Sequence, residues 1–132
     1  MSEGLLVMAG ELILIIEDNE KNRKLARDVL QVKGYQTIES ETAEEGLELA
    51  LEKSPALILM DIQLPGIDGI TALKQLRLNP KTKSIPVIAI TASAMTYNRQ
   101  TMLAEGFDGY QTKPISLKDF LAEVQRVLAT AK

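Results

Sequence analysis

The chain of 132 residues contains no cysteine and no histidine. Without cysteine it can form no disulfide bond, no thiol nucleophile and no thiolate zinc site. Without histidine it has no Ser-His catalytic pair, no histidine metal ligand and no phosphohistidine of its own. Its chemistry must therefore come from carboxylates, hydroxyls, lysine, arginine and the backbone.

The sequence also lacks a long hydrophobic run and an excess of basic residues. No segment approaches the length of a membrane span, and 1-MSEGLLVMAG-10 has neither the basic region nor the long apolar stretch of a signal peptide. A net charge of -3 gives no general attraction for nucleic acids or anionic membranes. We therefore expect a cytoplasmic protein with no direct DNA binding and no membrane contact.

The composition that remains is typical of one globular domain, with 45% hydrophobic and 25% charged residues. We predict a domain over residues 11–132 and a flexible N-terminal extension over residues 1–10. Five apolar runs alternate with five segments of helical period. Strands are expected at 12–16, 35–39, 56–60, 86–91 and 109–112, and helices at about 20–33, 43–53, 69–78, 97–105 and from 116 onward.

Three of the expected strands are apolar throughout: 12-LILII-16, 56-ALILM-60 and 86-PVIAI-90. Such strands are typically buried on both faces of a parallel sheet. Strict alternation of strand and helix with right-handed crossovers then predicts an α/β fold, a (βα)5 doubly wound sandwich around a five-stranded parallel sheet.

The pattern also predicts which helix faces are buried. The helix from Glu20 is expected to turn Leu25, Val29 and Val32 inward, and Thr42 with Glu45 forms a predicted capping box for the next helix. The last helix has one apolar face, made of Leu117, Phe120, Leu121, Val124, Val127 and Leu128. The outer faces of the last two helices are interpreted as solvated, and carry Asn98, Arg99, Gln100, Lys118, Glu123 and Gln125.

The residues at or just after the ends of four expected strands are candidates for a site. They are Glu17 and Asp18, then Asp61, then Thr91 and Ala92, and finally Lys113. Because ligands bind beyond the carboxyl ends of the strands in open parallel sheets, we expect these residues to form one site. Three carboxylates at close range repel one another, and a hard divalent cation such as Mg²⁺ would relieve that repulsion.

The same residues suggest phosphoryl chemistry. Asp61 is a candidate nucleophile toward phosphorus, and Lys113 and Thr91 could contact the phosphoryl oxygens. Each residue also has an ordinary explanation: Glu17 and Asp18 are suited to a helix entry, and Lys113 alone would be a surface residue. Their convergence at the same end of different strands favours a site.

The motifs 17-EDN-19, 59-LMDIQLPGIDG-69, 88-IAITA-92 and 113-KP-114 together resemble the receiver domain of two-component response regulators, the CheY-like family. The resemblance covers about residues 12–128. It implies a flavodoxin-like sheet with strand order 2-1-3-4-5.

The resemblance also implies a metal site. Asp61 would be the phospho-acceptor and would bind Mg²⁺, or Mn²⁺ in its place, together with Asp18 and the backbone carbonyl of Gln63. Glu17 would assist through a bound water molecule. Glu17 stands where many members of the family have aspartate, and its longer side chain could shift that contact.

For the remaining positions the resemblance implies a switch. Thr91, with Ala92 beside it, and Lys113 would contact the phosphoryl group, and Thr91 would move toward it. Tyr110 would be the switch aromatic and would swing inward. The peptide bond before Pro114 is expected to be cis, a rare geometry even at proline.

The function implied is that of a signalling phospho-acceptor and not of a conventional enzyme. A histidine kinase or a histidine phosphotransfer protein would donate the phosphoryl group. The face built from the helix at 97–105, the strand at 109–112 and the last helix would then change and control a downstream protein. We expect a monomer or a weak homodimer.

Alternatives remain at this stage. The chain resembles a stand-alone regulator that acts through protein contacts, as in the chemotaxis type, but the segments 91-TASAM-95 and 112-TKPI-115 also resemble receivers excised from hybrid histidine kinases. An aspartate-nucleophile phosphatase of the haloacid dehalogenase type would need a second acid where Gln63 stands. A nucleotide-binding domain is disfavoured because neither glycine-rich phosphate-binding motif is present.

Overall fold

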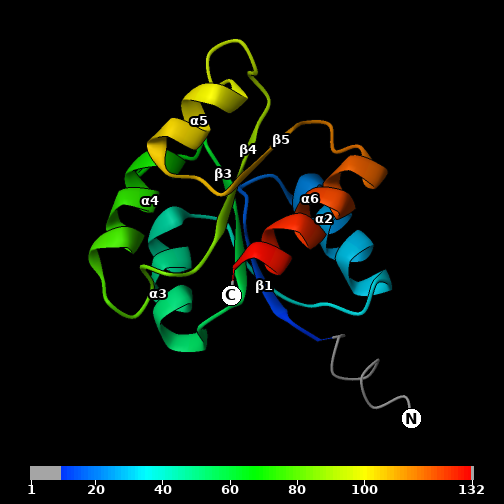
Figure 1. Cartoon of the computed structure of the whole chain (residues 1–132), viewed down its shortest axis with the longest axis horizontal. Helices are drawn as coiled ribbons and strands as arrows, with labels where there is room; N and C mark the ends of the chain where they lie inside the picture. Colours follow the sequence, from blue (N-terminus) through cyan, green and yellow to red (C-terminus); the bar gives the residue numbers. More distant parts are fainter. Residues whose placement is uncertain (1–9, 132) are drawn as a thin grey trace.

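Five parallel strands form the centre of the molecule, in the order β2-β1-β3-β4-β5 (Figure 1). The structure is a computed structural model that describes residues 10–131. The strands are β1 (Leu12–Ile16), β2 (Gln36–Ser40), β3 (Leu57–Asp61), β4 (Val87–Thr91) and β5 (Gly109–Thr112). The predicted (βα)5 doubly wound, flavodoxin-like fold and its strand order are confirmed.

Helices cover both faces of this sheet. They are α2 (Glu20–Val32), α3 (Ala43–Lys53), α4 (Gly69–Leu78), α5 (Arg99–Glu105) and α6 (Leu117–Thr130). In Figure 1, α3, α4 and α5 lie on one side of the sheet, and α2 and α6 lie on the other. The Thr42 hydroxyl accepts the Glu45 N–H at 3.1 Å, which is one half of the predicted capping box.

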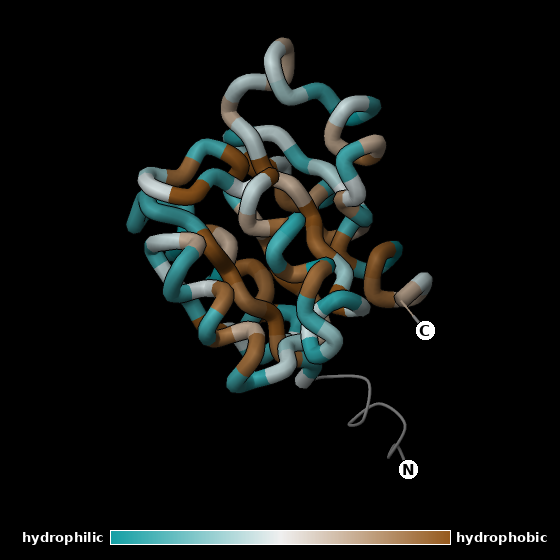
Figure 2. Tube along the Cα trace, turned by 90° about the vertical axis from the view of Figure 1, so that its left-hand side faces the viewer, coloured by the Kyte–Doolittle hydropathy of each residue, from teal (hydrophilic) through white to brown (hydrophobic). Residues whose placement is uncertain are grey.

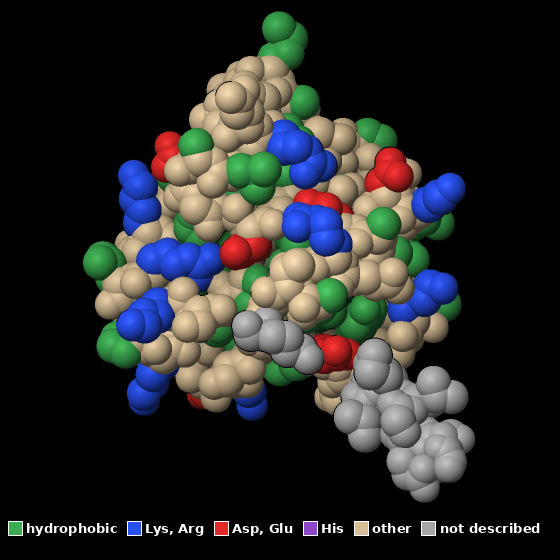
Figure 3. All heavy atoms as spheres, viewed as in Figure 1, with side chains coloured by type: hydrophobic (Ala, Val, Ile, Leu, Met, Phe, Trp, Pro, Cys, Tyr) green, Lys and Arg blue, Asp and Glu red, His purple; other side chains and the backbone are tan. Residues whose placement is uncertain are grey.

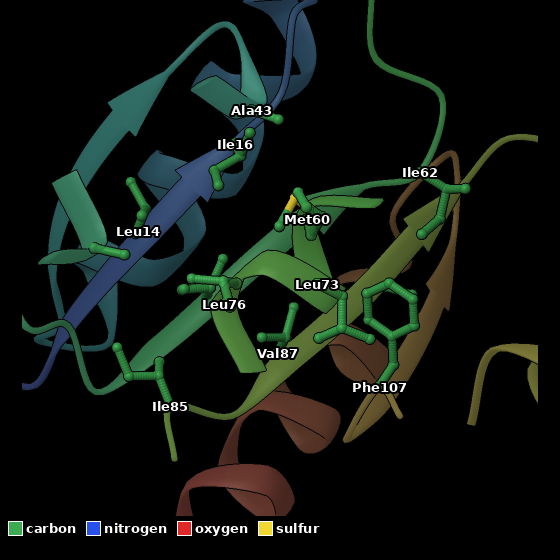
Figure 4. Packing of buried hydrophobic residues seen from close by; sticks show 14 of the residues in the cluster. Leu14, Ile16, Ala43, Met60, Ile62, Leu73, Leu76, Ile85, Val87 and Phe107 are labelled. Carbon is green, nitrogen blue, oxygen red and sulfur yellow. The ribbon is translucent and has the colours of Figure 1, made fainter. Parts of the chain in front are cut away.

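The sheet has a hydrophobic cluster on each face, because successive residues of a strand point to opposite faces. Ile13 and Ile15 of β1 pack with the residues under α2 and α6, whereas Leu14 and Ile16 pack with those under α3, α4 and α5. Figure 4 shows α4 contributing Leu73 to the second of these clusters. The brown, hydrophobic segments in Figure 2 run through the middle of the molecule.

The predicted N-terminal extension, residues 1–10, lies outside the described residues except for Gly10. None of the helices between residues 10 and 131 combines the length and the apolar character that crossing a bilayer requires.

The prediction for the buried face of α2 was wrong in part. Leu25 is 39% exposed and Val32 is 83% exposed, while Ala26 and Leu30 are buried. The stripe that faces the sheet is made of Ala26 and Leu30, which pack in one cluster with Ile13 and Ile15 of β1. Arg27, beside that stripe, donates a hydrogen bond to Glu39 of β2 at 2.8 Å. Val29 is partly buried against the core, as predicted.

One residue of the predicted apolar face of α6 is also misplaced. Leu117 is 52% exposed, whereas Phe120, Val124 and Val127 are buried. Leu117 is the first residue of α6, before the turn that packs against the sheet.

Gly69 generates a prediction about this packing. A Cβ atom at this position would lie 2.6 Å from the carbonyl oxygen of Asp61 and 2.9 Å from the Cα atom of Ile62. Both are main-chain atoms that cannot rotate away. We expect Gly69→Ala to lower the free energy of unfolding by about 1–3 kcal/mol, measured by urea denaturation.

The matched control is Lys74→Ala, at an exposed position of the same helix. Its effect should stay within about 0.5 kcal/mol. A Gly69→Ala protein as stable as the unsubstituted one would show that α4 does not press against the end of β3.

Candidate functional site

Asp61 is the last residue of β3, the central strand of the sheet. Its strand is buried along its whole length, and Asp61 itself is only 2% exposed. One carboxylate oxygen, Oδ1, accepts the Gln63 N–H at 3.1 Å, and the other, Oδ2, lies 2.9 Å from Nζ of Lys113. The strand thus fixes a carboxylate at the carboxyl end of the sheet. Gln63, two residues further along the loop, is exposed.

Glu17 and Asp18 follow β1, the neighbouring strand, and their carboxylates approach that of Asp61. One oxygen from each of the three residues lies within 4.8 Å of the others. Glu17 is buried, and its carboxylate accepts the Asn19 N–H at 3.0 Å. Asp18 is exposed. The predicted acidic cluster therefore exists.

Lys113 bridges two of these acids, because its Nζ lies 2.9 Å from Oε1 of Glu17 and 2.9 Å from Oδ2 of Asp61. Burial opposes the charge on Lys113, but the two carboxylates outweigh it and raise the pKa of the ammonium above its usual value. Burial raises the pKa of the Glu17 carboxyl, against the opposing hydrogen bonds from Asn19 and Lys113. The shared contact therefore favours the charged form of Lys113, whereas burial of Glu17 still favours the neutral form of its carboxyl group.

The donor set suits a hard divalent cation. One ammonium faces three carboxylates, so two negative charges remain uncompensated at the sheet edge. Mg²⁺ prefers oxygen ligands and usually takes one or two carboxylates directly. The residues present therefore fit the predicted metal.

Thr91 ends β4 next to this cluster. The register aligns Asp61 with Ile90, so Thr91 stands one residue beyond Asp61 on the adjacent strand. Its hydroxyl accepts the Ser93 N–H at 2.9 Å, which leaves the hydroxyl proton free to point elsewhere. Ala92, the next residue, is exposed.

The main chain of Lys113 is fixed to the same strand end. Its N–H donates to the Thr91 carbonyl at 2.8 Å. The following bond, Lys113–Pro114, is cis, the geometry that the family resemblance led us to expect.

Tyr110 is already buried in this structure, on the side of the sheet covered by α3, α4 and α5. Its hydroxyl donates to the Tyr97 carbonyl at 2.7 Å. The Arg99 guanidinium lies over the ring, 5.3 Å from its centroid, and donates to the Tyr110 carbonyl at 3.3 Å. Tyr110 is therefore held through its ring, its hydroxyl and its main chain.

Glu123 was predicted to be solvated, and that prediction was wrong. It is 8% exposed and accepts the Tyr110 N–H at 2.8 Å. Burial alone would raise the pKa of Glu123, but hydrogen bonds from Arg126 and the Tyr110 N–H outweigh it and lower the pKa below its usual value. The sequence did contain a signal, because Glu123 falls between Phe120, Val124 and Val127 on the apolar stripe of α6.

The side chains of Glu123, Arg99 and Arg126 cover the free edge of β5. In addition to the contacts of Glu123 and Arg99 with Tyr110, Arg126 donates to the Asp108 carbonyl at 2.9 Å. A polar groove of about 370 Å³ lies between α5 and α6 at this edge. Elsewhere on the face shown in Figure 3, Lys and Arg are interspersed with Asp and Glu.

The chain is similar to known proteins along most of its length. A family model described as the response regulator receiver domain matches residues 13–125. The polar-differentiation response regulator DivK of Brucella ovis is 42% identical over 119 residues, which cover 90% of this chain and 97% of that protein.

Solved structures show the same similarity. A putative response regulator from Chloroflexus aurantiacus has a TM-score of 0.85 and 28% identity, over 91% of this chain and 98% of the other. The receiver domain of a sensor histidine kinase from Pseudomonas aeruginosa has a TM-score of 0.84 and 30% identity, over 92% and 100% of the two chains. That structure has a magnesium ion coordinated in its active-site cleft.

The bridge made by Lys113 generates a second prediction. Lys113→Met would leave the buried carboxylates of Glu17 and Asp61 facing each other without a counter-charge. We expect the free energy of unfolding, measured in EDTA at about pH 7.5, to fall by about 3 kcal/mol. The exposed Lys118 provides a control, because Lys118→Met removes the same charge outside the cluster.

The loss of unfolding free energy in Lys113→Met should grow as the pH rises. A carboxyl whose folded pKa is raised above its unfolded value contributes stability at low pH that is lost as the pH rises through the folded pKa. The Glu17 pKa is already raised, and losing Lys113 would raise it further. The Lys113→Met deficit should therefore be smaller near pH 4.5 than at about pH 7.5, and a deficit independent of pH would contradict the shared ion pair.

Proposed function

Because the chain belongs to the response regulator receiver domain family, we propose that it is a response regulator that accepts a phosphoryl group on Asp61 in the presence of Mg²⁺. The donor is a histidine kinase or a histidine phosphotransfer protein. The observation that carries the proposal is the placement of the Asp61 carboxylate. It is buried at the end of the central strand, within reach of Lys113 and beside two further acids.

The residues present can perform each part of the transfer. An oxygen of Asp61 forms a bond to phosphorus while the bond to the donor histidine nitrogen breaks, and the electron pair of that bond returns to the imidazole. Mg²⁺, when held by Asp18, Asp61 and the Gln63 carbonyl with Glu17 in support, supplies positive charge that offsets the negative charge of the phosphoryl oxygens. Lys113 already lies beside Asp61 and supplies a second positive charge.

The proposed switch connects this site to the face of α5, β5 and α6. An acyl phosphate would add roughly one to two negative charges at the end of β3, by analogy with phosphoserine. The Thr91 hydroxyl has a proton to donate to it. Since Tyr110 is already buried here, the accompanying change involves the hydrogen bonds of Tyr110 to Tyr97 and Arg99 more than new burial of the ring.

The phosphatase alternative is less well supported. Gln63 occupies the position of the required second acid, and an amide does not donate and recover a proton as a carboxyl group does. The alternative that the chain is a receiver domain of a hybrid histidine kinase is supported by the similarity to receiver domains of two histidine kinases, at 30% and 29% identity. The genomic neighbourhood or the full-length transcript would separate a stand-alone regulator from such a receiver, and a phosphotransfer profile against candidate kinases would identify the donor.

Incubation with acetyl phosphate and Mg²⁺ should add one phosphoryl group per chain, detected by intact-protein mass spectrometry. Asp61→Asn should abolish this labelling, because an amide oxygen cannot form the acyl phosphate. Asp68→Asn is the control, since Asp68 is an exposed acid of the same loop that caps α4. Undiminished labelling of the Asp61→Asn protein would refute the assignment.

The assignment of the metal ligands gives a separate prediction. Asp18→Ala should weaken Mg²⁺ binding at least about tenfold in a calorimetric titration, because it removes a proposed direct ligand. Glu20→Ala removes a nearby exposed acid that lies outside the cluster and should leave the affinity unchanged. Equal affinities in the two variants would exclude a direct role for Asp18.

A further inference from the structure

Arg23 of α2 contacts the acidic loop at 17–19 without touching any of its carboxylates. Its guanidinium Nη1 donates to the Glu17 carbonyl at 2.9 Å. Its main-chain N–H donates to the Asn19 carbonyl at 3.0 Å, as the first bond of the helix. A single residue therefore holds both ends of Glu17–Asn19, and the side-chain contact is the one that a substitution can remove.

Asp18 depends on this main-chain support more than the other two acids do. The Glu17 and Asp61 carboxylates are fixed by Lys113 and by backbone N–H groups. Within residues 10–131 the Asp18 carboxylate takes part in no hydrogen bond or ion pair, and Asp18 is exposed. Its position beside Glu17 and Asp61 is therefore set by the backbone that carries it.

The Arg23 guanidinium is itself held in place. Its Nε lies 3.4 Å from Oε1 of Glu39, and its Nη2 lies 3.8 Å from Oε2 of Glu41. The Arg23 side chain is only 12% exposed. Since a guanidinium stays protonated at any ordinary pH and offers several donors in a rigid plane, Arg23 can join β2 to the Glu17 carbonyl permanently.

We propose that Arg23 is a positioning residue for metal binding. Through the Glu17 carbonyl it keeps the Asp18 carboxylate close to those of Glu17 and Asp61, the three residues that would hold Mg²⁺, and so it sets the affinity of the site. The inference rests on the proposed function, which assigns the metal to these acids. Residues that orient metal ligands commonly change the affinity by one to two orders of magnitude when they are lost.

Arg27 provides a closely matched control. It lies one turn further along α2 and pairs with the same residue, Glu39, at 2.8 Å. Among the described residues its side chain forms no hydrogen bond or ion pair with the loop at 17–19. Arg27→Met therefore removes the same charge and an ion pair to the same partner, but leaves the Glu17 carbonyl contact intact.

The test is a calorimetric titration of the whole protein with Mg²⁺ alone. Arg23→Met should weaken binding about tenfold, whereas Arg27→Met should change it by less than about twofold. Arg23→Lys should fall between Arg23→Met and the unsubstituted protein, since an ammonium can donate to the Glu17 carbonyl but cannot bridge to Glu39 and Glu41 at the same time. Arg23→Lys also preserves the charge should Arg23→Met fold poorly.

A second measurement needs no metal. The Asn19 N–H donates to the Glu17 carboxylate, so its hydrogen exchange in EDTA reports how well the loop is held. Exchange at Asn19 should be faster in Arg23→Met and unchanged in Arg27→Met.

Equal effects of the two arginine substitutions on Mg²⁺ affinity, or no effect of either, would overturn the inference. Asp18→Ala tells this failure from that of the proposed function. If Asp18→Ala weakens binding and Arg23→Met does not, only the role of Arg23 is lost. If Asp18→Ala also binds with full affinity, the metal site itself is wrong.

Discussion

The contact of one ammonium with two buried carboxylates determines how the carboxyl end of the sheet is built. Lys113 leaves β5 and meets Asp61 of β3 and Glu17 after β1, so it joins three strand ends. This arrangement is costly without Mg²⁺, because Asp18 adds a third carboxylate that Lys113 does not neutralise. The apolar strands, whose residues are buried on both faces, supply the stability that keeps these acids together.

In a second cluster of charged residues, around Glu123, the negative charge is fully paired with positive groups. Glu123 is buried, but Arg126, Arg99 and the Tyr110 N–H surround its carboxylate. This paired cluster covers the free edge of β5, whereas the acids around Asp61 retain uncompensated charge. The two clusters lie close along the chain, since Tyr110 is three residues before Lys113. In the proposed function, β5 is the element that would connect a phosphoryl group on Asp61 to the α5–β5–α6 face.

The sequence predicted the features that depend on short-range pattern. Continuous apolar runs identified the buried strands, and the position of each acid, hydroxyl and lysine after a strand identified the cluster. It did not predict which face of α2 is buried, because Leu25–Val29 and Ala26–Leu30 are both apolar pairs at helical spacing and only packing against the sheet selects between them. Glu123 was misjudged for a related reason, since its partners Tyr110 and Arg99 come from β5 and α5.

The three acids at the site differ in how far their carboxylates are already engaged by other groups. Both carboxylate oxygens of Glu17 are occupied, one by the Asn19 N–H and one by Lys113. Asp61 keeps one oxygen on Lys113 and one on a backbone N–H. Asp18 is left as the acid with an uncommitted carboxylate among the described residues, so a cation would find its least hindered ligand there, on the loop that Arg23 supports.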